Sequence, residues 1–491
     1  MKKFIITLAA SGLLGFLAYS QSDVDALRYS RLNIGGTARF MSMGGAFSAL
    51  GADFTTLSTN PGGLGLYKKS EFSITPSFYT GLTKSSYNGS KSDDIQYNFN
   101  LGNVGLVITS QPKNKSKSVF RNFQFALGLN RLNNFNNRML MEGYNSENSL
   151  IDTYVESANG IYYGEIEDDI YGFYSYDLNP AWYTYLIDTI PGFDDQYYGA
   201  IPAGGGIYQR KEIETWGSMN EFVLSLGANI SEKVYLGGTF GFPFIRYFEK
   251  STYSETDLDN IHDDFDNLRL YDDLQTHGAG FNMKFGAIVR ATDWFRIGGA
   301  IHSPTWFNNM TDDWYSELTT EFDNGDYFKS TSPYGTYDYQ IHTPWRALGG
   351  VSFIIGKRAL ISADYEFVDY SMAKLRATQY NFYDENNAIK TKYKETHNIR
   401  LGSEVRFGQF AVRAGYNYNS SPFTNNINDG ARSYYSGGVG YRDKDFFVDF
   451  AYVRSVSHED YYFYGTEDIN VNPVKNDLIS NNFLLTVGFR Y

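Results

Sequence analysis

The sequence ends in NNFLLTVGFRY, residues 481–491, and large apolar side chains occupy every second position of this stretch. The two parities of the alternation are Phe483, Leu485, Val487, Phe489 and Tyr491 on one side, and Leu484, Thr486, Gly488 and Arg490 on the other. A period of two predicts an extended strand with one apolar face. The question that decides the fold is whether this face meets a protein core or lipid.

About fourteen stretches of the chain show the same alternation. Opposite the large aliphatic residues, the second face mixes charged residues with Gly and Ala, which suits a crowded, wet lumen better than the surface of a soluble sandwich. The connections alternate between short and long, as is typical of outer-membrane barrels. We therefore predict an all-β fold: a transmembrane antiparallel β-barrel of about 14 strands over residues 70–491. Its longest extracellular loop, residues 134–215, is expected to be partly helical.

The composition agrees with such a barrel. The 491 residues have a mean hydropathy of -0.39, a formal net charge of -13, no Cys and many aromatic residues. After the N-terminus no stretch approaches the roughly 20 consecutive apolar residues of a membrane helix, whereas half-apolar strands give a low mean hydropathy. A strongly negative chain repels nucleic acid, so no nucleic-acid partner is expected.

Residues 1–20 have the pattern of a signal peptide: a basic start at Lys2 and Lys3, an apolar run over 4–17 and a small-x-small end at 18–20. The alternative is an amphipathic first helix. Export and an even strand number predict an integral protein of a diderm outer membrane, in contact with its lipid, with both termini periplasmic. We further expect barrel-assembly machinery to bind the C-terminal strand at Phe489 and Tyr491.

Residues 21–69 lack the alternation and are dense in Gly and Ala, with larger apolar residues interspersed: Phe40, Met41, Met43, Phe47 and Leu50. A flexible tail would be more polar. A barrel of about fourteen strands has a lumen wider than its side chains fill. The segment is therefore predicted to plug the lumen as a small N-terminal domain.

The run RFMSMGGAFSALGADFTTLSTNPGGLGLY, residues 39–67, resembles the N-terminal hatch of FadL-type outer-membrane transporters for long-chain fatty acids and other hydrophobic compounds. Asn60, Pro61 and Gly62 match an Asn-Pro-Ala motif of that hatch, with Gly62 in place of alanine, which we expect to make the turn more mobile. The resemblance extends over nearly the whole mature chain.

The resemblance implies passive transport and no enzymatic activity. An apolar ligand is captured among the outer loops, binds inside the barrel, and leaves sideways through the wall when the hatch moves. The five larger apolar residues of the segment are then candidate ligand contacts.

Two irregularities mark a candidate lateral exit. The apolar parity slips in the second strand, which predicts a bulge at Gly102 and Asn103, and RLNNFNN, residues 131–137, ends the alternation of the third strand. The exit would be lined by Gly102, Asn103, Asn130, Asn133 and Asn134. An ordinary bulge that curves the wall is the alternative.

The long loop contains DLNPAWYTYLIDTI, residues 177–190, which predicts a helix with Asn179 as N-cap and Pro180 at the first position. Four residues would form an apolar stripe for ligand capture: Trp182, Tyr185, Leu186 and Ile190. Alternatively, the loop helices pack only on one another.

Other chemistry is weakly represented. His302 and Ser303 are the only adjacent pair that could suggest a hydrolase, and the six His residues are scattered, so neither catalysis, a cofactor nor a bound metal is expected. The acidic residues of 257–266 fit a solvated loop, with calcium binding as the alternative. Two other functions stay open: a structural or secretion-accessory barrel that binds protein partners at its extracellular loops, and a general diffusion porin.

Overall fold

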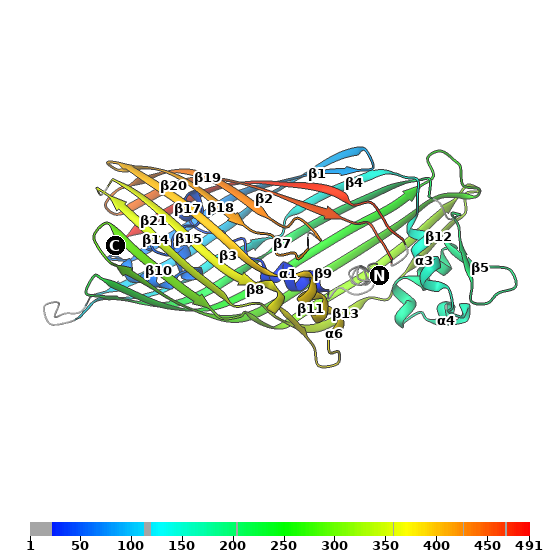
Figure 1. Cartoon of the computed structure of the whole chain (residues 1–491), viewed down its shortest axis with the longest axis horizontal. Coiled ribbons are helices and arrows are strands. Elements are labelled where there is room, and N and C mark those ends of the chain that lie inside the picture. The colour runs from blue at the N-terminus through cyan, green and yellow to red at the C-terminus, as the bar shows by residue number, and fades with distance from the viewer. Residues whose placement is uncertain (1–21, 112–118, 203–204, 357, 426, 467–468) are drawn as a thin grey trace, which may run out of the picture.

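A computed structural model describes residues 22–111, 119–202, 205–356, 358–425, 427–466 and 469–491. The expected signal peptide, residues 1–20, and much of the first short connection, residues 112–118, lie outside these ranges. The chain forms a long barrel with short turns at one end and longer loops at the other (Figure 1). We refer to these as the short-turn end and the long-loop end. The C-terminus lies at the short-turn end.

Nineteen strands form one sheet: β1 (Glu71–Tyr87), β2 (Ser90–Ser110), β3 (Phe120–Asn134), β4 (Asn137–Asn145), β7 (Ile207–Ile230), β8 (Val234–Thr256), β9 (Phe265–Arg290), β10 (Phe295–His302), β11 (Trp306–Phe322), β12 (Tyr327–Thr331), β13 (Gly335–His342), β14 (Arg346–Ile355), β15 (Ala359–Asp369), β16 (Lys374–Arg376), β17 (Glu395–Phe407), β18 (Phe410–Asn419), β19 (Arg432–Arg442), β20 (Phe446–Tyr461) and β21 (Val474–Arg490). Two short strands, β5 (Ile187–Thr189) and β6 (Tyr197–Gly199), pair separately. The helices are α1 (Asp23–Ser30), α2 (Ala38–Ser42), η1 (Phe54–Ser58), η2 (Pro61–Leu66), α3 (Leu150–Ala158), α4 (Tyr163–Asp168), η3 (Phe173–Tyr176), α5 (Leu178–Tyr183), η4 (Tyr370–Met372) and α6 (Tyr383–Lys392).

The sheet closes on itself as an antiparallel barrel of 14 strands, which confirms the predicted fold class. The order around the wall is β1, β2, β3, β7, β8, β9, β10, β14, β15, β17, β18, β19, β20 and β21. β21 then pairs with β1 from Glu71↔Arg490 to Ser86↔Lys475. The remaining wall strands β4, β11, β13 and β16 continue β3, β10, β14 and β15 after an interruption.

The alternation decides which residues face outward. At the C-terminus Phe483, Leu485 and Phe489 are exposed, whereas Leu484 and Thr486 are buried. The other wall strands show the same pattern near the short-turn end, where an outward band of large apolar residues surrounds the closed barrel. This is the surface of a transmembrane barrel, because closure leaves no unpaired edge in lipid. Among the described residues, no helix is long and apolar enough to cross a membrane.

Two of the long connections that the loss of alternation predicts, residues 83–95 and 251–276, are mostly strands that continue beyond the apolar band. β1 and β2 meet in a turn at Asn88 and Gly89, and β8 and β9 leave only residues 257–264 between them. The inward face of these extensions is partly buried, as at Tyr87, Leu268 and Leu270, but their outward face is largely polar, so the apolar alternation that reveals a membrane strand is lost. For the same reason the longest loop is shorter than predicted: β4 and β7 occupy parts of residues 134–215, and the loop with its helices covers 146–206.

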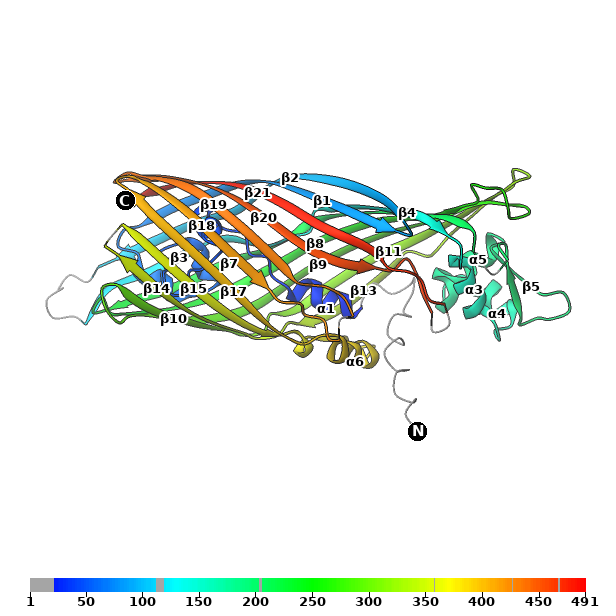
Figure 2. The ribbon, with the colours of Figure 1, turned by 45° about the horizontal axis from the view of Figure 1, so that its top comes forward.

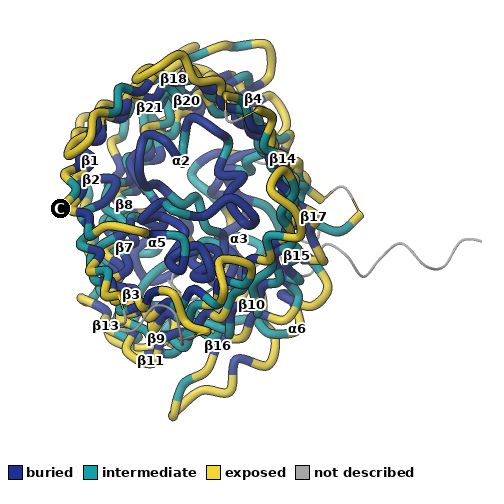
Figure 3. The backbone as a smooth tube through the Cα atoms, turned by 90° about the vertical axis from the view of Figure 1, so that its left-hand side faces the viewer, coloured by how far each residue is buried: buried dark blue, intermediate teal, exposed yellow. Residues whose placement is uncertain are grey.

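Residues 22–70, here called the N-terminal segment, lie inside the barrel (Figure 3). α1 lies near the middle of the long axis, so the first described residues are not at the short-turn end (Figure 2). At the other end of the segment, Ser70 and Tyr491 exchange two backbone hydrogen bonds of 3.1 Å. The junction with β1 is thereby fixed to the C-terminal strand.

The outward band predicts a cost for charge on its surface. Leu485 is 42% exposed and pairs with Phe450 on β20. We expect Leu485→Arg to lower the free energy of unfolding from lipid vesicles by about 2–4 kcal/mol, since a cation near the bilayer midplane is poorly solvated. The matched control Tyr327→Arg changes an exposed residue of β12, at the long-loop end, and should have little effect. Equal losses in the two variants would contradict the assignment of the band to lipid.

Candidate functional site

The motif Asn60-Pro61-Gly62 joins the N-terminal segment to the wall. The Asn60 side chain accepts a hydrogen bond from the Gly62 N–H at 3.0 Å and donates to the carbonyl oxygens of Ser48 at 2.5 Å and Ala287 at 3.1 Å. It thus caps η2 and binds β9 at the same time. A Cβ atom on residue 62 would lie 2.8 Å from the Ala287 backbone. Gly62 therefore permits the close approach to β9, and its effect on the mobility of the turn stays a prediction.

Inward-facing glycines of the wall form close packing contacts with the N-terminal segment, here called the glycine contacts. A Cβ atom on Gly402 would lie 2.5 Å from the Met43 carbonyl oxygen, and one on Gly438 2.6 Å from Ser42 Cβ. The same holds for further wall glycines with their partners in the segment: Gly105 with Phe54, Gly227 with Leu64, Gly237 with Pro61, Gly286 with Asn60, Gly298 with Ser48 and Gly415 with Gly44. The glycines of the polar face therefore make room for backbone and side-chain atoms of the N-terminal segment.

Buried ion pairs add directional contacts. Glu404 on β17 accepts from Arg39 of α2 at 3.2 Å and from Arg413 of β18 at 2.6 Å, and Arg413 also pairs with Asp449 at 2.6 Å. On the opposite side of the lumen, Ser58 donates to Glu221 at 2.8 Å. Removing one member of such a buried network leaves an uncompensated charge and costs about 3–5 kcal/mol. Sequence reasoning missed these contacts, because Arg39 and Ser58 lie 365 and 163 residues from their wall partners and the other pairs join different strands.

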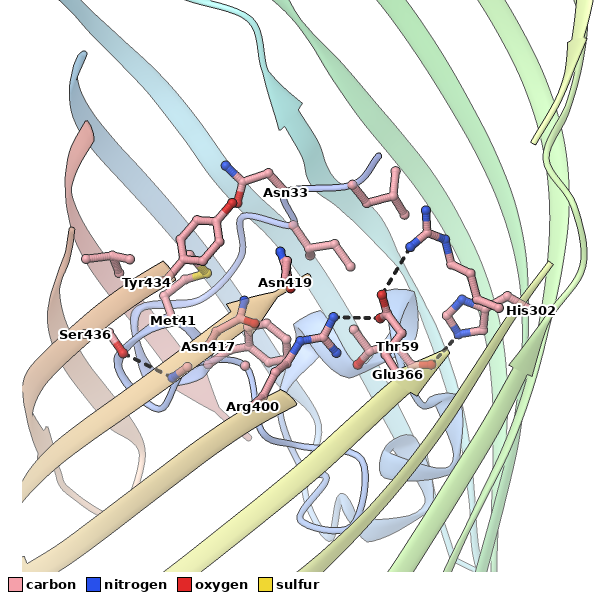
Figure 4. Close-up of a pocket in the computed structure, with 17 residues that line it drawn as sticks. Asn33, Met41, Thr59, His302, Glu366, Arg400, Asn417, Asn419, Tyr434 and Ser436 are labelled. Atoms are coloured by element: carbon pink, nitrogen blue, oxygen red, sulfur yellow. Dashed lines mark hydrogen bonds and ion pairs between the residues drawn. The ribbon is translucent and has the colours of Figure 1, made fainter. Parts of the chain in front are cut away.

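The five larger apolar residues of the segment fall into two groups. Met43, Phe47 and Leu50 pack on Leu360 of the wall, and the Phe40 and Phe47 rings lie 5.2 Å apart. Only two of the five, Phe40 and Met41, line a cavity in the centre of the barrel (Figure 4). Most of the predicted ligand contacts are thus packing residues in this structure.

The central cavity has a mixed lining and a volume of about 50 Å³. Its apolar residues are Leu32, Ile34, Phe40, Met41 and Val453. Among its polar residues Glu366 accepts from Arg346 at 3.2 Å and from Arg400 at 2.6 Å (Figure 4). Arg400 Nη1 and Asn417 Oδ1 have no hydrogen-bond partner among the described residues. The cavity can therefore offer a polar anchor to an otherwise apolar molecule.

The wall is split between its second and third strands. The β2–β3 ladder runs from Ser110↔Phe123 to Asn103↔Asn130. Beyond that pair, the described residues of β2 pair with β1 only, and β4 pairs with β7 only. Gly102 is left out of the β1 register, so the predicted bulge is confirmed. The split begins directly at this bulge.

The N-terminal segment covers the split from inside. The Asn33 N–H donates to the Leu132 carbonyl oxygen and the Gly35 N–H to that of Arg131, each at 2.9 Å. A Cβ atom on Gly102 would lie 2.8 Å from the Gly36 carbonyl oxygen. Residues 33–36 thus provide hydrogen-bond donors to part of the β3 edge that has no β2 partner. Sequence reasoning had no signal for this pairing, because it is a backbone contact.

Most of the predicted exit residues contact the N-terminal segment. The Asn130 amide donates to the Ser58 hydroxyl at 2.9 Å, and the Asn133 amide donates to the Arg31 carbonyl oxygen at 3.3 Å. Asn103 accepts from Thr75 at 2.6 Å within the wall. Asn134 lines a further cavity of about 140 Å³ beside the split. The structure therefore brings all five residues to one place.

α1 connects this region to α6, which lies in the connection between β16 and β17. Tyr29 packs edge-on against Phe135, which lies in the break between β3 and β4, with ring centroids 6.1 Å apart. Asp23 accepts from Lys392 at 3.1 Å and from Tyr393 at 2.9 Å, at the end of α6. Burial raises the pKa of the Asp25 carboxyl to about 7, although the neighbouring Arg28 acts in the opposite direction.

The predicted capture stripe does not form. α5 ends at Tyr183, because the backbone of Tyr185 is left-handed with φ of 58°. Its N-cap is Asp177 rather than Asn179. The four stripe residues consequently diverge: Trp182 stacks on Tyr163, Leu186 is fully buried, Tyr185 is 56% exposed and Ile190 is 36% exposed. The loop helices pack on one another in a core of their own, as in the alternative reading.

The other candidate chemistry finds no assembled site. His302 Nε2 donates to the Thr59 carbonyl oxygen at 2.5 Å, whereas the Ser303 hydroxyl donates to that of Pro304 at 2.8 Å. In the acidic turn Asp257 accepts from the His262 N–H at 2.6 Å. Within the described ranges, no group of three or more His, Asp or Glu residues could hold a metal ion.

The glycine contacts predict that a larger side chain at one of these positions loosens the N-terminal segment. In Gly286→Val the new side chain would overlap Asn60 Oδ1, and overpacking of this kind costs about 1–3 kcal/mol. We expect amide hydrogen exchange over residues 54–66 to accelerate by about 5- to 150-fold. Gly349→Val is the matched control, because a Cβ atom there meets nothing within 4 Å. Unchanged hydrogen exchange in Gly286→Val would show that docking of the segment does not depend on the contact at Gly286.

No protein-family model and no curated protein matches the sequence. Solved structures do match. The chain is similar to the toluene transporter TodX of P. putida (11% identity, 93% of this chain and 99% of that one, TM-score 0.54) and to a FadL homologue of Pseudomonas aeruginosa (13%, 93% and 98%, 0.53). It is also similar to the monoaromatic hydrocarbon channel CymD (13%, 94% and 100%, 0.50). At these identities the likeness concerns the fold: this chain has the barrel fold of FadL-type outer-membrane transporters.

Proposed function

We propose that this protein mediates passive transport of hydrophobic small molecules across the outer membrane of a diderm bacterium, with the short-turn end in the periplasm. The fold shared with hydrocarbon and FadL-type transporters supports this function. The observation that carries the proposal is the split between β2 and β3, covered by residues 33–36 of the N-terminal segment. The segment then acts as a hatch, and residues 21–69 are the boundaries that we propose for it.

A lateral route suits an apolar cargo. Each CH₂ group moved from lipid into water costs about 0.8 kcal/mol, so a cargo that leaves through the split into the bilayer avoids this cost. A cavity of about 50 Å³ is too small for most ligands, whose sites span roughly 300–1,000 Å³. The described conformation therefore corresponds to a closed state, and binding requires the hatch to move. The filled lumen also argues against a general diffusion porin.

The contact between α1 and α6 suggests how capture is coupled to release. α6 belongs to the connection between β16 and β17 and lies near the middle of the long axis (Figures 1 and 2), and Asp23 of α1 binds Lys392 and Tyr393 at its end. A cargo that displaces α6 would pull on the same segment that covers the split. Long-chain fatty acids and small aromatic hydrocarbons both fit this route.

A second candidate function is protein binding at the long loops. The stretch from Met139 to Gln209 contains twelve acidic residues and no Lys or Arg. Several of its aromatic residues are exposed, among them Tyr171 at 82% and Phe173 at 64%. This surface would favour a cationic partner through charge complementarity.

A disulfide between hatch and wall tests the transport proposal. Ser58 and Asn130 are in contact at 2.9 Å, and the native chain has no Cys. We expect oxidised S58C/N130C to take up radiolabelled toluene and oleate at least about tenfold more slowly, because the cross-link removes the open state. A reductant should restore uptake.

The control for this experiment is S225C/T239C, which links two neighbouring wall strands whose hydroxyl groups lie 2.7 Å apart. It adds the same chemistry without fixing the hatch, so uptake should not change on oxidation. Uptake by oxidised S58C/N130C at the rate of the reduced protein would refute hatch-gated release at this place.

A further inference from the structure

A second cavity lies at the short-turn end, beneath the N-terminal segment, with a volume of about 520 Å³. Eight cationic and two acidic side chains line it. Such an excess of positive charge is unexpected in a chain with a formal net charge of -13. It is also on the opposite end of the barrel from the acidic long loop. The transport route through the split makes no use of this cavity.

Carboxylates within the wall balance only part of the charge. Glu404 pairs with Arg39 and with Arg406, and Glu71 pairs with Arg490. Three other cations of the lining, Arg296, Arg358 and Lys68, have no carboxylate within 4.0 Å among the described residues. These three charges come from β10, from the turn before β15 and from the end of the N-terminal segment.

Two guanidinium groups of the lining each have one buried N–H, at Nε, without an acceptor among the described residues. Arg296 donates through Nη1 to the Leu50 carbonyl oxygen at 3.3 Å, but its Nε is buried without a hydrogen-bond partner. Arg442 Nε is likewise buried without a hydrogen-bond partner, although Nη2 of Arg442 lies 3.6 Å from the Asp449 carboxylate. A buried N–H without an acceptor is costly, so the arrangement is incomplete as it stands.

We propose that this cavity binds an oxyanion with two or more negative charges, such as a phosphate group. Guanidinium groups match phosphate oxygens through paired, charge-assisted hydrogen bonds, and the cavity has room for more than one phosphate. The N-terminal segment supplies Arg39 and Lys68, whereas the wall supplies Arg296, Arg358 and Arg406. A bound anion therefore bridges segment and wall and stabilises the segment in its docked position.

Two sources can provide this chemistry: the headgroup of an anionic phospholipid or a soluble phosphate compound. The first arm of the test titrates purified protein in a neutral detergent with inorganic pyrophosphate by calorimetry. The second arm measures lipid retained by native mass spectrometry from nanodiscs that contain phosphatidylglycerol. The double variant R296Q/R358Q removes the two unpaired wall charges, and we expect it to bind the probe at least about tenfold more weakly.

The control variant R210Q/K329Q removes the same net charge at the long-loop end, where Arg210 is paired with Glu212 and Lys329 with Glu317. It should bind like the unmodified protein, and R296K/R358K, which keeps the charge, should retain much of the affinity. Heat-modified migration in gels shows whether each variant is folded. Variant-dependent binding in either arm supports the site and identifies its source. Absence of binding in both arms, or equal weakening by the two charge-removing variants, overturns it.

Discussion

Closure of the wall by β1 and β21 is the constraint on which the rest of the structure depends. A backbone group exposed to lipid has no water to bind, so every strand of a transmembrane sheet needs a neighbour on each side. Closure with 14 strands then creates a lumen that side chains alone do not fill. The N-terminal segment fills it, and the wall glycines let its backbone approach closely. Glycine in the wall and the segment inside are thus two consequences of one requirement.

The exception to complete pairing lies where β2 leaves β3. Such an edge would be unfavourable in lipid, and the wall tolerates it because the Asn33 and Gly35 N–H groups bind the free carbonyl oxygens of β3 from inside. Whether the edge at the split is covered therefore depends on the position of the N-terminal segment. While the segment stays docked, the edge is covered, and displacement of the segment uncovers it. In the proposed mechanism the hatch and the lateral gate are therefore one device, built from backbone groups that a continuous ladder would have used.

Much of this architecture could be predicted from the sequence, because the alternation of Phe483, Leu485 and Phe489 reports directly on a lipid-facing strand. The phase slip at Gly102 likewise located the bulge. The prediction failed where this signal is absent: strand extensions without an outward apolar face look like loops, and the α5 stripe stopped at the left-handed Tyr185. The partners of Arg39 and Asn33 could not be found, because a contact between distant segments leaves no local pattern in one sequence. The basic cavity was missed for the same reason, since its charges are scattered from residue 39 to residue 490.

The central claim is that the lumen is closed by the N-terminal segment at rest. The ionic conductance of the unmodified protein in a planar lipid bilayer, without cargo, tests it most directly. A barrel whose lumen is filled by residues 22–70 should show no steady channel after insertion. Long-lived open currents of the size that general diffusion porins give would contradict the account, because ions would then cross a lumen that the structure fills.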